Sequence, residues 1–332
     1  MLLAGDIGGT KTNLAVFSAE DLSGGARLRA ALAQGTFASA DYPSLEAIVR
    51  EFLGQADLDI ERAAFGVAGP VVNDRAQITN LPWVIDAAHM QSALGFASVE
   101  LLNDLEAIAN AVPFLSPDDL YTLNVGQPEH EGAMAVIAPG TGLGEAYLTW
   151  EGGRYHAHAS EGGHTSFAPN DDLQIDLLRY LRKNFGHVSW ERACSGHGIP
   201  NIYAFLKESG RAEEPDWLAE RLSAAEDPAP VISGVALDGE TECDICSQTL
   251  DLFVSILGAE AGNLAITVMA TGGVYLGGGI PPRVLPILKR GRFMDAFWHK
   301  GRMAELLVRM PVHVIMNPKA ALLGAACHTL EL

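Results

Sequence analysis

The sequence Gly5-Asp6-Ile7-Gly8-Gly9-Thr10-Lys11-Thr12 stands between two short, mostly apolar runs, residues 1–4 and 13–17. This pattern predicts a strand, a tight glycine turn and a second strand. Two adjacent glycines allow positive φ and a close approach of the backbone to a ligand. Successive backbone N–H groups in such a turn form a concave anion site, and the hydroxyls of Thr10 and Thr12 can add donors. For the glycine pair alone, an ordinary hairpin is the alternative.

Asp6 is placed where the first strand meets the turn, which suits a carboxylate that holds Mg²⁺ directly or through water. Two better-known phosphate motifs do not fit. A Walker A loop would need glycine at the position of Thr10. A dinucleotide fingerprint would need a helix after Thr12, whereas residues 13–17 have the pattern of a strand.

The pattern returns later in the chain. Residues 133–138 are apolar, Pro139-Gly140-Thr141-Gly142-Leu143-Gly144 follows, and residues 145–150 again read as a strand. A third glycine-rich stretch, residues 271–279, comes after a helical pattern. Two similar hairpins predict a duplicated unit with a ligand between its halves. The third turn could let a purine lie against the backbone.

Composition limits the partners. The chain has 332 residues, 48% of them hydrophobic, which is enough for two modest domains. The net charge of −19 repels nucleic acid and anionic membranes, so we expect neither as a partner. A nucleotide should therefore arrive with Mg²⁺ and be held by backbone N–H groups.

The cysteines predict a reduced, cytoplasmic protein. Cys243-x2-Cys246 resembles half of a zinc site, but no second pair follows at suitable spacing. The first residues lack the basic segment of a signal peptide. The longest apolar stretch, residues 252–280, is interrupted by Glu260, Asn263 and several glycines, so it predicts a buried helix and a strand rather than a membrane span.

Periodicity and caps place the remaining elements. We predict strands at 63–67, 98–102 and 311–316, and loops at 73–79 and 208–230. The predicted helices are 42–53 with Ser44 as N-cap, 86–94 ended by Gly95, 105–112, 173–185, 193–207, 243–268, parts of 281–303, and 318–329. Pro113 and Pro117 mark the first domain junction.

Polar residues gather after predicted strands and turns. Asn103 and Asp104 follow a strand, where open α/β sheets bind ligands, although both are also good N-caps. Glu161 and His164 resemble a metal pair, as do His156 and His158, but glycines between the first two argue against a helical pair. Glu191 could equally cap a helix. Carboxylates, Asn and His together suit a sugar, and a sugar beside phosphate-binding turns indicates phosphoryl transfer.

Taken in order, these motifs resemble the bacterial glucokinase family, within the actin/hexokinase/Hsp70 ATPase superfamily and related to the ROK sugar kinases. The resemblance spans nearly the whole chain. It rests on Gly5–Thr10, Asn80-Leu81-Pro82-Trp83, Leu102-Asn103-Asp104, Gly140–Gly144, Glu161–His164, Ser189-Trp190-Glu191, the Cys243-x2-Cys246 helix, Gly272–Ile280 and Leu323–Ala326.

The resemblance implies an α/β, two-domain actin-like ATPase (ribonuclease H-like) fold with a ligand cleft between the domains. The small domain would comprise residues 1–114 and 317–332, and the large domain residues 115–316. ATP would lie in the cleft with glucose deeper in it, and the protein would be a homodimer.

The resemblance also implies roles for single residues. Asp104 would be the catalytic base for in-line transfer to the 6-hydroxyl of glucose, and Asp6 would hold Mg²⁺. The sugar would contact Asn103, Asp104, Glu161, His164 and Glu191. ATP would contact Gly5, Asp6, Ile7, Gly8, Gly9, Thr10, Gly140, Thr141, Gly277 and Gly278.

Some features depart from the family. Lys11-Thr12 is closer to ROK kinases, whose Cys/His zinc motif is missing, and an acidic residue at Glu145 is unexpected beside the second phosphate turn. Two alternatives stay open: a kinase of the same fold for another hexose, such as glucosamine or mannose, and a sugar-sensing regulator without turnover. The negative charge and the early position of Asp6 argue against a DNA-binding regulator.

Overall fold

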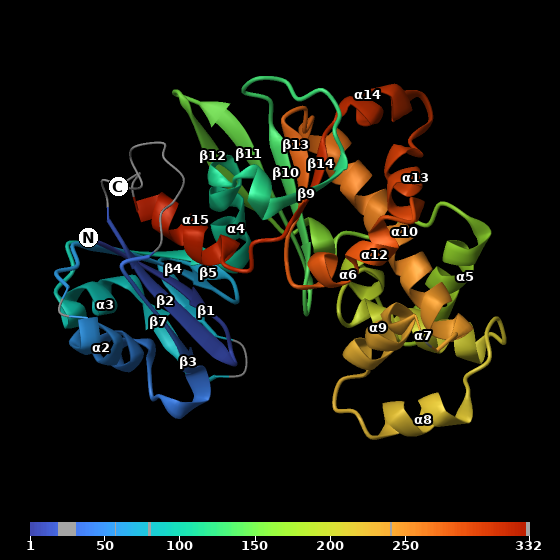
Figure 1. Ribbon diagram of the computed structural model, residues 1–332, viewed down its shortest axis with the longest axis horizontal. Coiled ribbons are helices and arrows are strands. Elements are labelled where there is room, and N and C mark those ends of the chain that lie inside the picture. The colour runs from blue at the N-terminus through green and yellow to red at the C-terminus, as the bar shows by residue number, and fades with distance from the viewer. Residues whose placement is uncertain (19–30, 57, 79–80, 240, 330–332) are drawn as a thin grey trace. The chain divides into compact units, whose positions relative to one another are not determined.

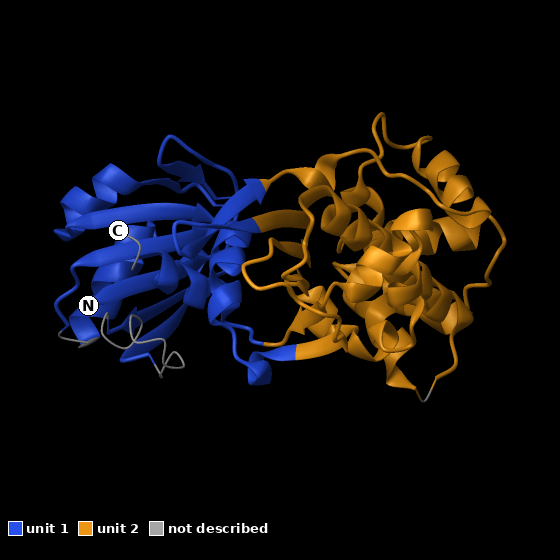
Figure 2. Cartoon of the chain, turned by 90° about the horizontal axis from the view of Figure 1, so that it is seen from above, with its two compact units in different colours: residues 1–120, 148–159, 317–332 blue, residues 121–147, 160–316 orange. Residues whose placement is uncertain are grey.

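The computed structural model describes residues 1–18, 31–56, 58–78, 81–239 and 241–329. Contacts between residues divide the chain into two units, which Figure 2 colours separately. The first unit comprises residues 1–120, 148–159 and 317–332, and the second comprises residues 121–147 and 160–316. The fold class is mixed α/β, as predicted.

The opening hairpin organises the first sheet (Figure 1). Strands β1 (Leu2–Ile7) and β2 (Lys11–Phe17) pair antiparallel, with Asp6 opposite Asn13. The sheet has the order β3-β2-β1-β4-β8, in which β3 is Ala33–Ala38, β4 is Arg62–Val67 and β8 is Ser98–Asn103. Strands β1, β4 and β8 run parallel, so their carboxyl ends meet at one edge. Successive side chains of β1 point to opposite faces of the sheet, so this strand contributes to the packing on both faces.

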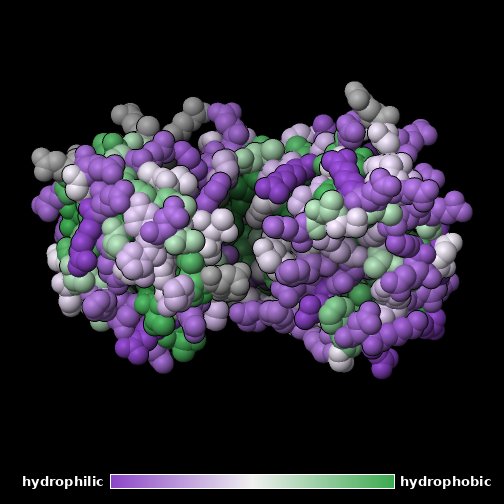
Figure 3. Space-filling view, turned by 90° about the horizontal axis from the view of Figure 1, so that it is seen from below, coloured by the Kyte–Doolittle hydropathy of each residue, from purple (hydrophilic) through white to green (hydrophobic). Residues whose placement is uncertain are grey.

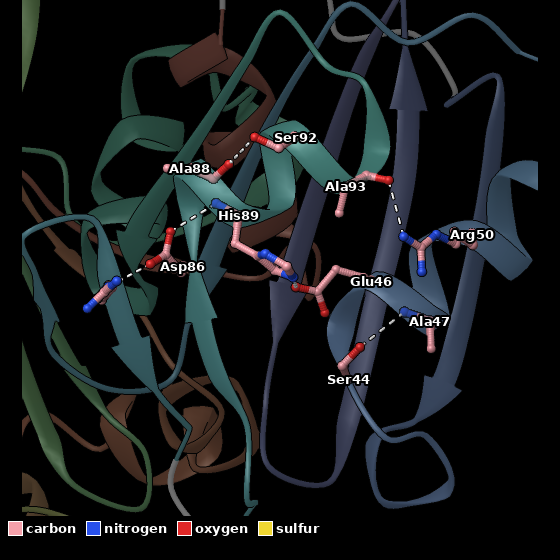
Figure 4. Close-up of polar contacts among 10 residues, drawn as sticks. Ser44, Glu46, Ala47, Arg50, Asp86, Ala88, His89, Ser92 and Ala93 are labelled. Carbon is pink, nitrogen blue, oxygen red and sulfur yellow. Dashed lines mark hydrogen bonds and ion pairs between the residues drawn. The ribbon is translucent and has the colours of Figure 1, made fainter.

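One face of this sheet packs against α2 (Leu45–Ala56) and α3 (Ala87–Leu94). Ser44 accepts the N–H of Ala47 as the predicted cap, and Gly95 ends α3 with φ 77°. Figure 4 shows how α2 and α3 are joined: Arg50 donates to the carbonyl of Ala93 at 3.1 Å, and Asp86 caps α3 through the N–H of His89. These caps fix the two helices over the sheet.

The opposite face packs against the last helix. Helix α15 (Ala320–Thr329) places Leu322, Ala325 and Ala326 against Leu2 and Ala4 of β1. It also contacts α4 (Asp104–Ala111) closely, because Gly324 has no side chain: a Cβ there would overlap the carbonyl oxygen of Ala107 and lie 2.8 Å from the nitrogen of Ala111. The helix that begins with Asp104 is therefore held from its side by α15.

The prediction of a loop at residues 73–79 is wrong for its middle part. Residues Arg75–Gln77 form β6, between β5 (Val71–Val72) and β7 (Val84–Asp86) in a small sheet of order β5-β6-β7. Asn73 and Asp74 make the hairpin turn with φ of 52° and 57°. A three-residue strand is too short to show a hydrophobic period. Thr79 and Asn80 lie outside the described residues.

A second sheet has the order β12-β11-β10-β13-β14-β9. The second predicted hairpin is present as β10 (Met134–Pro139) and β11 (Leu143–Glu151). Strands β10, β13 (Gly273–Leu276) and β14 (Val312–Ile315) run parallel. The other two strands, which the sequence did not reveal, are β9 (Leu120–Asn124) and β12 (Arg154–Ser160).

The long apolar helix α10 (Asp244–Val268) forms the centre of the second unit's core. It is long and apolar enough to cross a membrane by composition, but 67% of its most apolar window is buried against other residues of this protein. Gly258 and Gly262 let α13 (Arg292–Trp298) approach so closely that a Cβ on either glycine would collide with its carbonyls. The prediction of a buried helix followed by a strand is confirmed.

Shorter helices surround this core. The predicted surface excursion at 208–230 contains a helix, α8 (Asp216–Ser223), which Leu218 anchors in the core. The other helices and turns are η1 (Ser39–Asp41), η2 (Val112–Phe114), η3 (Pro117–Asp119), η4 (Gly162–His164), α5 (Asp172–Leu181), α6 (Trp190–Ala193), α7 (Gly198–Glu208), α9 (Pro228–Asp238), α11 (Ile280–Arg283), α12 (Leu285–Leu288), η5 (Gly301–Met303) and α14 (Ala304–Arg309).

The face in Figure 3 is mostly hydrophilic on each unit, with smaller hydrophobic areas between polar side chains. Single exposed valines, such as Val72, Val84 and Val125, fit this ordinary surface.

Candidate active site

The first cluster of polar residues lies at one edge of the first sheet. Ile7, at the end of β1, pairs with Val67 of β4, and Val67 pairs with Asn103 at the end of β8. Neighbouring strands are about 4.8 Å apart, so the ends of β1 and β8 are about 10 Å apart. The register therefore brings Asp6 to the same sheet edge as Asn103 and Asp104.

Asn103 and Asp104 begin α4. The Asn103 Oδ1 accepts the N–H groups of Leu105 and Glu106 at 2.9 and 2.8 Å, so the N-cap interpretation is correct for this residue. Asp104 is exposed, and its Oδ1 accepts the N–H of Leu105 at 2.9 Å. The cap fixes the backbone of Asp104, a residue that is itself exposed. The two interpretations of the pair are thus compatible.

Asp6 is held by a chain of hydrogen bonds from neighbouring strands. Asn13 donates from Nδ2 to Asp6 Oδ2 at 3.2 Å, and Thr36 donates to Asn13 Oδ1 at 2.9 Å. Burial raises the pKa of Asp6, and the bond from Asn13 opposes this rise. The carboxylate lines a pocket of about 530 Å³ together with Lys11 and Lys319. A single oriented carboxylate suits Mg²⁺ that keeps most of its waters.

The first glycine turn closes with a bond from the N–H of Gly8 to the carbonyl of Lys11 at 2.9 Å. The Ser39 hydroxyl donates to the carbonyl of Gly8 at 2.8 Å. The expected positive φ is absent at both Gly8 and Gly9. A Cβ at Gly8 would lie 3.1 Å from the Lys11 oxygen, a tight contact that needs a small shift, whereas a Cβ at Gly5 would collide with the Phe65 ring.

The second turn and Glu191 lie together in the second unit. Glu191 accepts the N–H of Leu143 at 3.1 Å through Oε2, and a Cβ on Gly142 would overlap this oxygen. The carboxylate of Glu191 thus bonds to the start of β11, which argues against the capping alternative. Gly196 donates to the carbonyl of Gly140 at 2.7 Å, which holds the turn in place.

Glu161 and His164 flank a tight turn beside the same strand. Glu161 Oε2 and His164 Nε2 lie 3.7 Å apart, and the two side chains are 76% and 60% exposed, so both can reach a ligand. Gly163 packs directly on the carbonyl of Leu143, where no Cβ would fit. Since Leu143 also binds Glu191, the structure brings Glu161, His164, Glu191 and the Gly140 turn into one neighbourhood.

A pocket of about 410 Å³ opens beside the second turn. Its wall includes the predicted residues Gly140 and Thr141, and it also includes Gly279 and Arg283. Gly278 has φ 79° and approaches Pro139 too closely for a side chain, and Gly277 donates to the carbonyl of Ile137. These two predicted glycines therefore pack the third turn against β10, and the wall of the pocket begins one residue later.

Helix α9 supplies the opposite wall of this pocket through Asp227, Pro230, Ser233, Gly234 and Leu237. Sequence reasoning missed this helix because it was hidden in a charged, proline-rich segment. The available signal was Asp227-Pro228, an N-cap followed by proline at the first helical position; Asp227 accepts the N–H of Ala229 at 3.0 Å.

The alternative metal sites receive no support. His158 shares a hydrogen bond with Thr149 at 2.8 Å, and His156 contacts the carbonyl of Glu151 at 3.2 Å. Among the residues that the structure describes, no three His, Cys, Asp or Glu side chains gather as metal ligands do. Cys243 and Cys246 are buried free thiols, and burial raises the pKa of Cys246.

Comparison with known proteins agrees with this architecture. A crystal structure of glucokinase from an Antarctic psychrotroph superposes with a TM-score of 0.85 at 33% identity, covering 100% of this chain and 99% of that one. A ROK family glucokinase from Streptomyces griseus, solved with glucose and AMPPNP, superposes with a TM-score of 0.62 at 20% identity, covering 98% and 97%. The fold is thus the two-domain, actin-like α/β fold of sugar kinases.

Sequence comparison is more specific. The profile of the glucokinase family matches residues 3–332. The curated glucokinase of Nostoc punctiforme is 40% identical over 339 residues, which cover 98% of each chain. The chain belongs to the glucokinase family, whose members are kinases that transfer phosphate from ATP to glucose.

Proposed function

We propose that this protein transfers the γ-phosphoryl group of ATP to the 6-hydroxyl of D-glucose. The observation that carries the proposal is the shared sheet edge: β1 and β8 end in register on either side of β4, so the backbones that carry Asp6 and the Asn103–Asp104 pair are about two strand spacings, ~10 Å, apart. This spacing leaves room for a phosphoryl group and a hydroxyl in line. Family membership supports the same reaction.

Asp104 is proposed as the base. It would orient the 6-hydroxyl and accept its proton, and a loose transition state lets that proton leave late. Asn103 would meet the sugar through Nδ2, since its Oδ1 already accepts two backbone N–H groups. Glu161, His164 and Glu191 would bind the remaining hydroxyls. Carboxylates accept paired bonds from adjacent hydroxyls, and His supplies a donor or an acceptor.

ATP is proposed to contact both glycine turns. Gly5 to Thr10 and Gly140-Thr141 would face the phosphates, with Ile7 contributing its backbone because its side chain is buried. The adenosine would lie in the 410 Å³ pocket, whose size falls in the usual range for small ligands. Gly277 and Gly278 would support this pocket, Asp227 and Ser233 would suit the ribose hydroxyls, and Arg283 would lie over the base.

Asp6 is proposed to hold Mg²⁺ through water. The ion would neutralise charge on the phosphates during transfer. Two neighbouring side chains, Asn13 and Thr36, would hold the Asp6 carboxylate in place for the ion. Lys11 lies in the same pocket.

The assembly and domain limits are part of the proposal. A small domain of residues 1–114 and 317–332 and a large domain of residues 115–316 would close on the substrates and expel water. The contact-based units support a division of this kind, although they group residues 115–120 and 148–159 with the first part. We further propose a cytoplasmic homodimer; the described cysteines form no disulfide with one another, which fits a reducing compartment.

A coupled ADP-release assay with Mg·ATP tests the function. The panel contains glucose, mannose, fructose, glucosamine and N-acetylglucosamine, with a no-sugar control. We expect strong turnover with glucose. Turnover with another hexose alone would overturn the specificity and keep the chemistry. Glucose binding without any turnover would indicate the sugar-sensing regulator instead.

A further inference from the structure

Two acidic side chains are buried together in the second unit. Glu145 on β11 is 3% exposed and Glu260 on α10 is 5% exposed. The two carboxyl groups interact, since each one shifts the pKa of the other. Buried carboxylates are rare unless they are paired, and two ionised carboxylates this close would repel each other.

The surroundings of the pair favour a proton shared between the two carboxyl groups. If Glu145 were ionised, its Oε1 atom would be buried and would have no hydrogen-bond donor among the described residues. A hydrogen bond between two carboxyl groups needs one of them to be protonated, and such a proton would supply the missing donor. Burial raises the pKa of Glu145 to about 7, and burial together with the charge of Glu145 raises the pKa of Glu260 to about 8.

Two other titratable groups face the pair. Lys300 lies beside Glu260, but it donates at 2.7 Å both to the carbonyl of Ala259 and to Asn263 Oδ1. Asn263 in turn donates to Glu260 Oε2 at 2.8 Å. Burial and the two carboxyl groups raise the pKa of the Cys194 thiol well above its usual value, so Cys194 stays neutral. Of these four groups, the two glutamates are the ones whose pKa values lie near neutral pH.

The pair touches the turn that carries Glu161 and His164. A Cβ on Gly162 would overlap Glu145 Oε2, and the carboxyl carbon would lie 2.8 Å away. The Ser160 hydroxyl accepts the N–H of Gly162 at 3.0 Å, which fixes the other side of the turn. Glu145 thus lies directly beneath the backbone between the two proposed sugar contacts.

We propose that Glu145 and Glu260 form a proton-sharing carboxyl pair that positions Gly162, and through it the Glu161–His164 turn, for binding the sugar. This inference rests on the proposed function of that turn. Full ionisation of the pair places a second negative charge in the core. Repulsion then moves the Glu145 carboxylate against Gly162 and displaces the turn, so the affinity for glucose falls as pH rises.

The test measures the Kd for glucose without ATP, and the KM for glucose with ATP, from pH 6.5 to 9.5. For the wild type we expect both to rise about tenfold by pH 9, as for a single proton that leaves near pH 8. Glu145→Gln keeps the shape and removes the charge, so its Kd should stay constant over this range. The kcat at saturating glucose should stay within about twofold of the wild type at each pH.

Two variants serve as controls. Glu151→Gln neutralises an exposed glutamate on the same strand and should keep the wild-type pH profile. Glu161→Gln removes a proposed sugar contact and should raise Kd at every pH, with the same relative rise at alkaline pH. Glu260→Gln repeats the test should Glu145→Gln not fold.

The outcomes separate the two proposals. A flat wild-type Kd, or a Gln variant that keeps the alkaline rise, would overturn the carboxyl pair while glucose turnover persists. Absence of glucose binding and turnover at every pH would instead overturn the proposed function.

Discussion

Asn13 donates from its side-chain amide to the carboxylate of Asp6 at 3.2 Å, and the two residues are register partners on β1 and β2. Thr36, opposite Asn13 on β3, orients that amide. Three adjacent strands thus hold one carboxylate at the edge where a phosphate would arrive. Since burial raises the pKa of Asp6 and Asn13 opposes that rise, this contact keeps the carboxylate ionised at lower pH.

Asp6→Asn should raise the KM for Mg·ATP at least ~10-fold, because the neutral amide no longer attracts the hydrated ion. The KM for glucose should stay within about twofold. Initial rates at varied Mg·ATP and fixed glucose measure the effect, with Asp41→Asn as an exposed acidic control in the same unit. An equal loss of glucose affinity would contradict the assignment.

Asp104→Asn should lower kcat at least ~100-fold, the usual effect of removing a general base. Glucose binding measured by titration should change little. Asp172→Asn is the matched control, since Asp172 is also an exposed acid in the first turn of a helix. A change confined to KM would show that Asp104 only binds the sugar.

Gly234→Leu should raise the KM for ATP at least ~10-fold with little change for glucose. Gly234 lines the 410 Å³ pocket, and a Cβ there would meet nothing within 4 Å, so a substitution starts in open space and adds bulk at the wall of the pocket. Gly54→Leu makes the same change at an open helical position in α2. An unchanged KM for ATP in Gly234→Leu would show that the adenosine does not bind in this pocket.

Glu260→Gln should stabilise the protein at alkaline pH. The raised pKa values of Glu145 and Glu260 mean that the folded state binds more protons than the unfolded state, so stability falls from about pH 4.5 to about pH 8. The difference in the free energy of unfolding between the variant and the wild type should be at least ~1 kcal/mol more favourable to the variant at pH 8.5 than at pH 6. Thermal melting at both pH values measures this difference, and equal shifts at the two would refute it.

Gly324→Ala should destabilise the protein by about 1–3 kcal/mol, because the new methyl group overlaps the carbonyl of Ala107. Gly54→Ala is the control and should stabilise by up to ~1 kcal/mol, since its space is open. Urea unfolding gives both values. A neutral Gly324→Ala would mean that α15 can move away from α4 at little cost.

Local signals predicted much of this fold. The hairpins and the strand leading to Asn103 are apolar runs next to turn or polar residues, and α10 is one long apolar run; all of them are present. Strands β6 and β12 were missed, because one is three residues long and the other is only half-buried, so neither shows a clear apolar pattern.

The site was predicted less evenly. The glycine turns and the acidic residues could be found in the sequence because their types and spacing are unusual. Helix α9 left one local signal, the N-cap Asp227 followed by Pro228, which its charged, proline-rich surroundings obscured. The partnership of Glu145 with Glu260 could not be found, because it depends on packing between distant segments. The roles of the individual site residues and the domain limits stay predictions.

The contact between α15 and α4 has a consequence for synthesis. A ribosome making this chain completes β1, β4 and α4 long before it reaches α15, and the whole second unit is translated in between. Until then, Leu2 and Ala4 lack the apolar cover that α15 provides. Asp104 thus gains its final support only in the last stretch of translation, so nascent chains that stop earlier should need chaperones and lack activity.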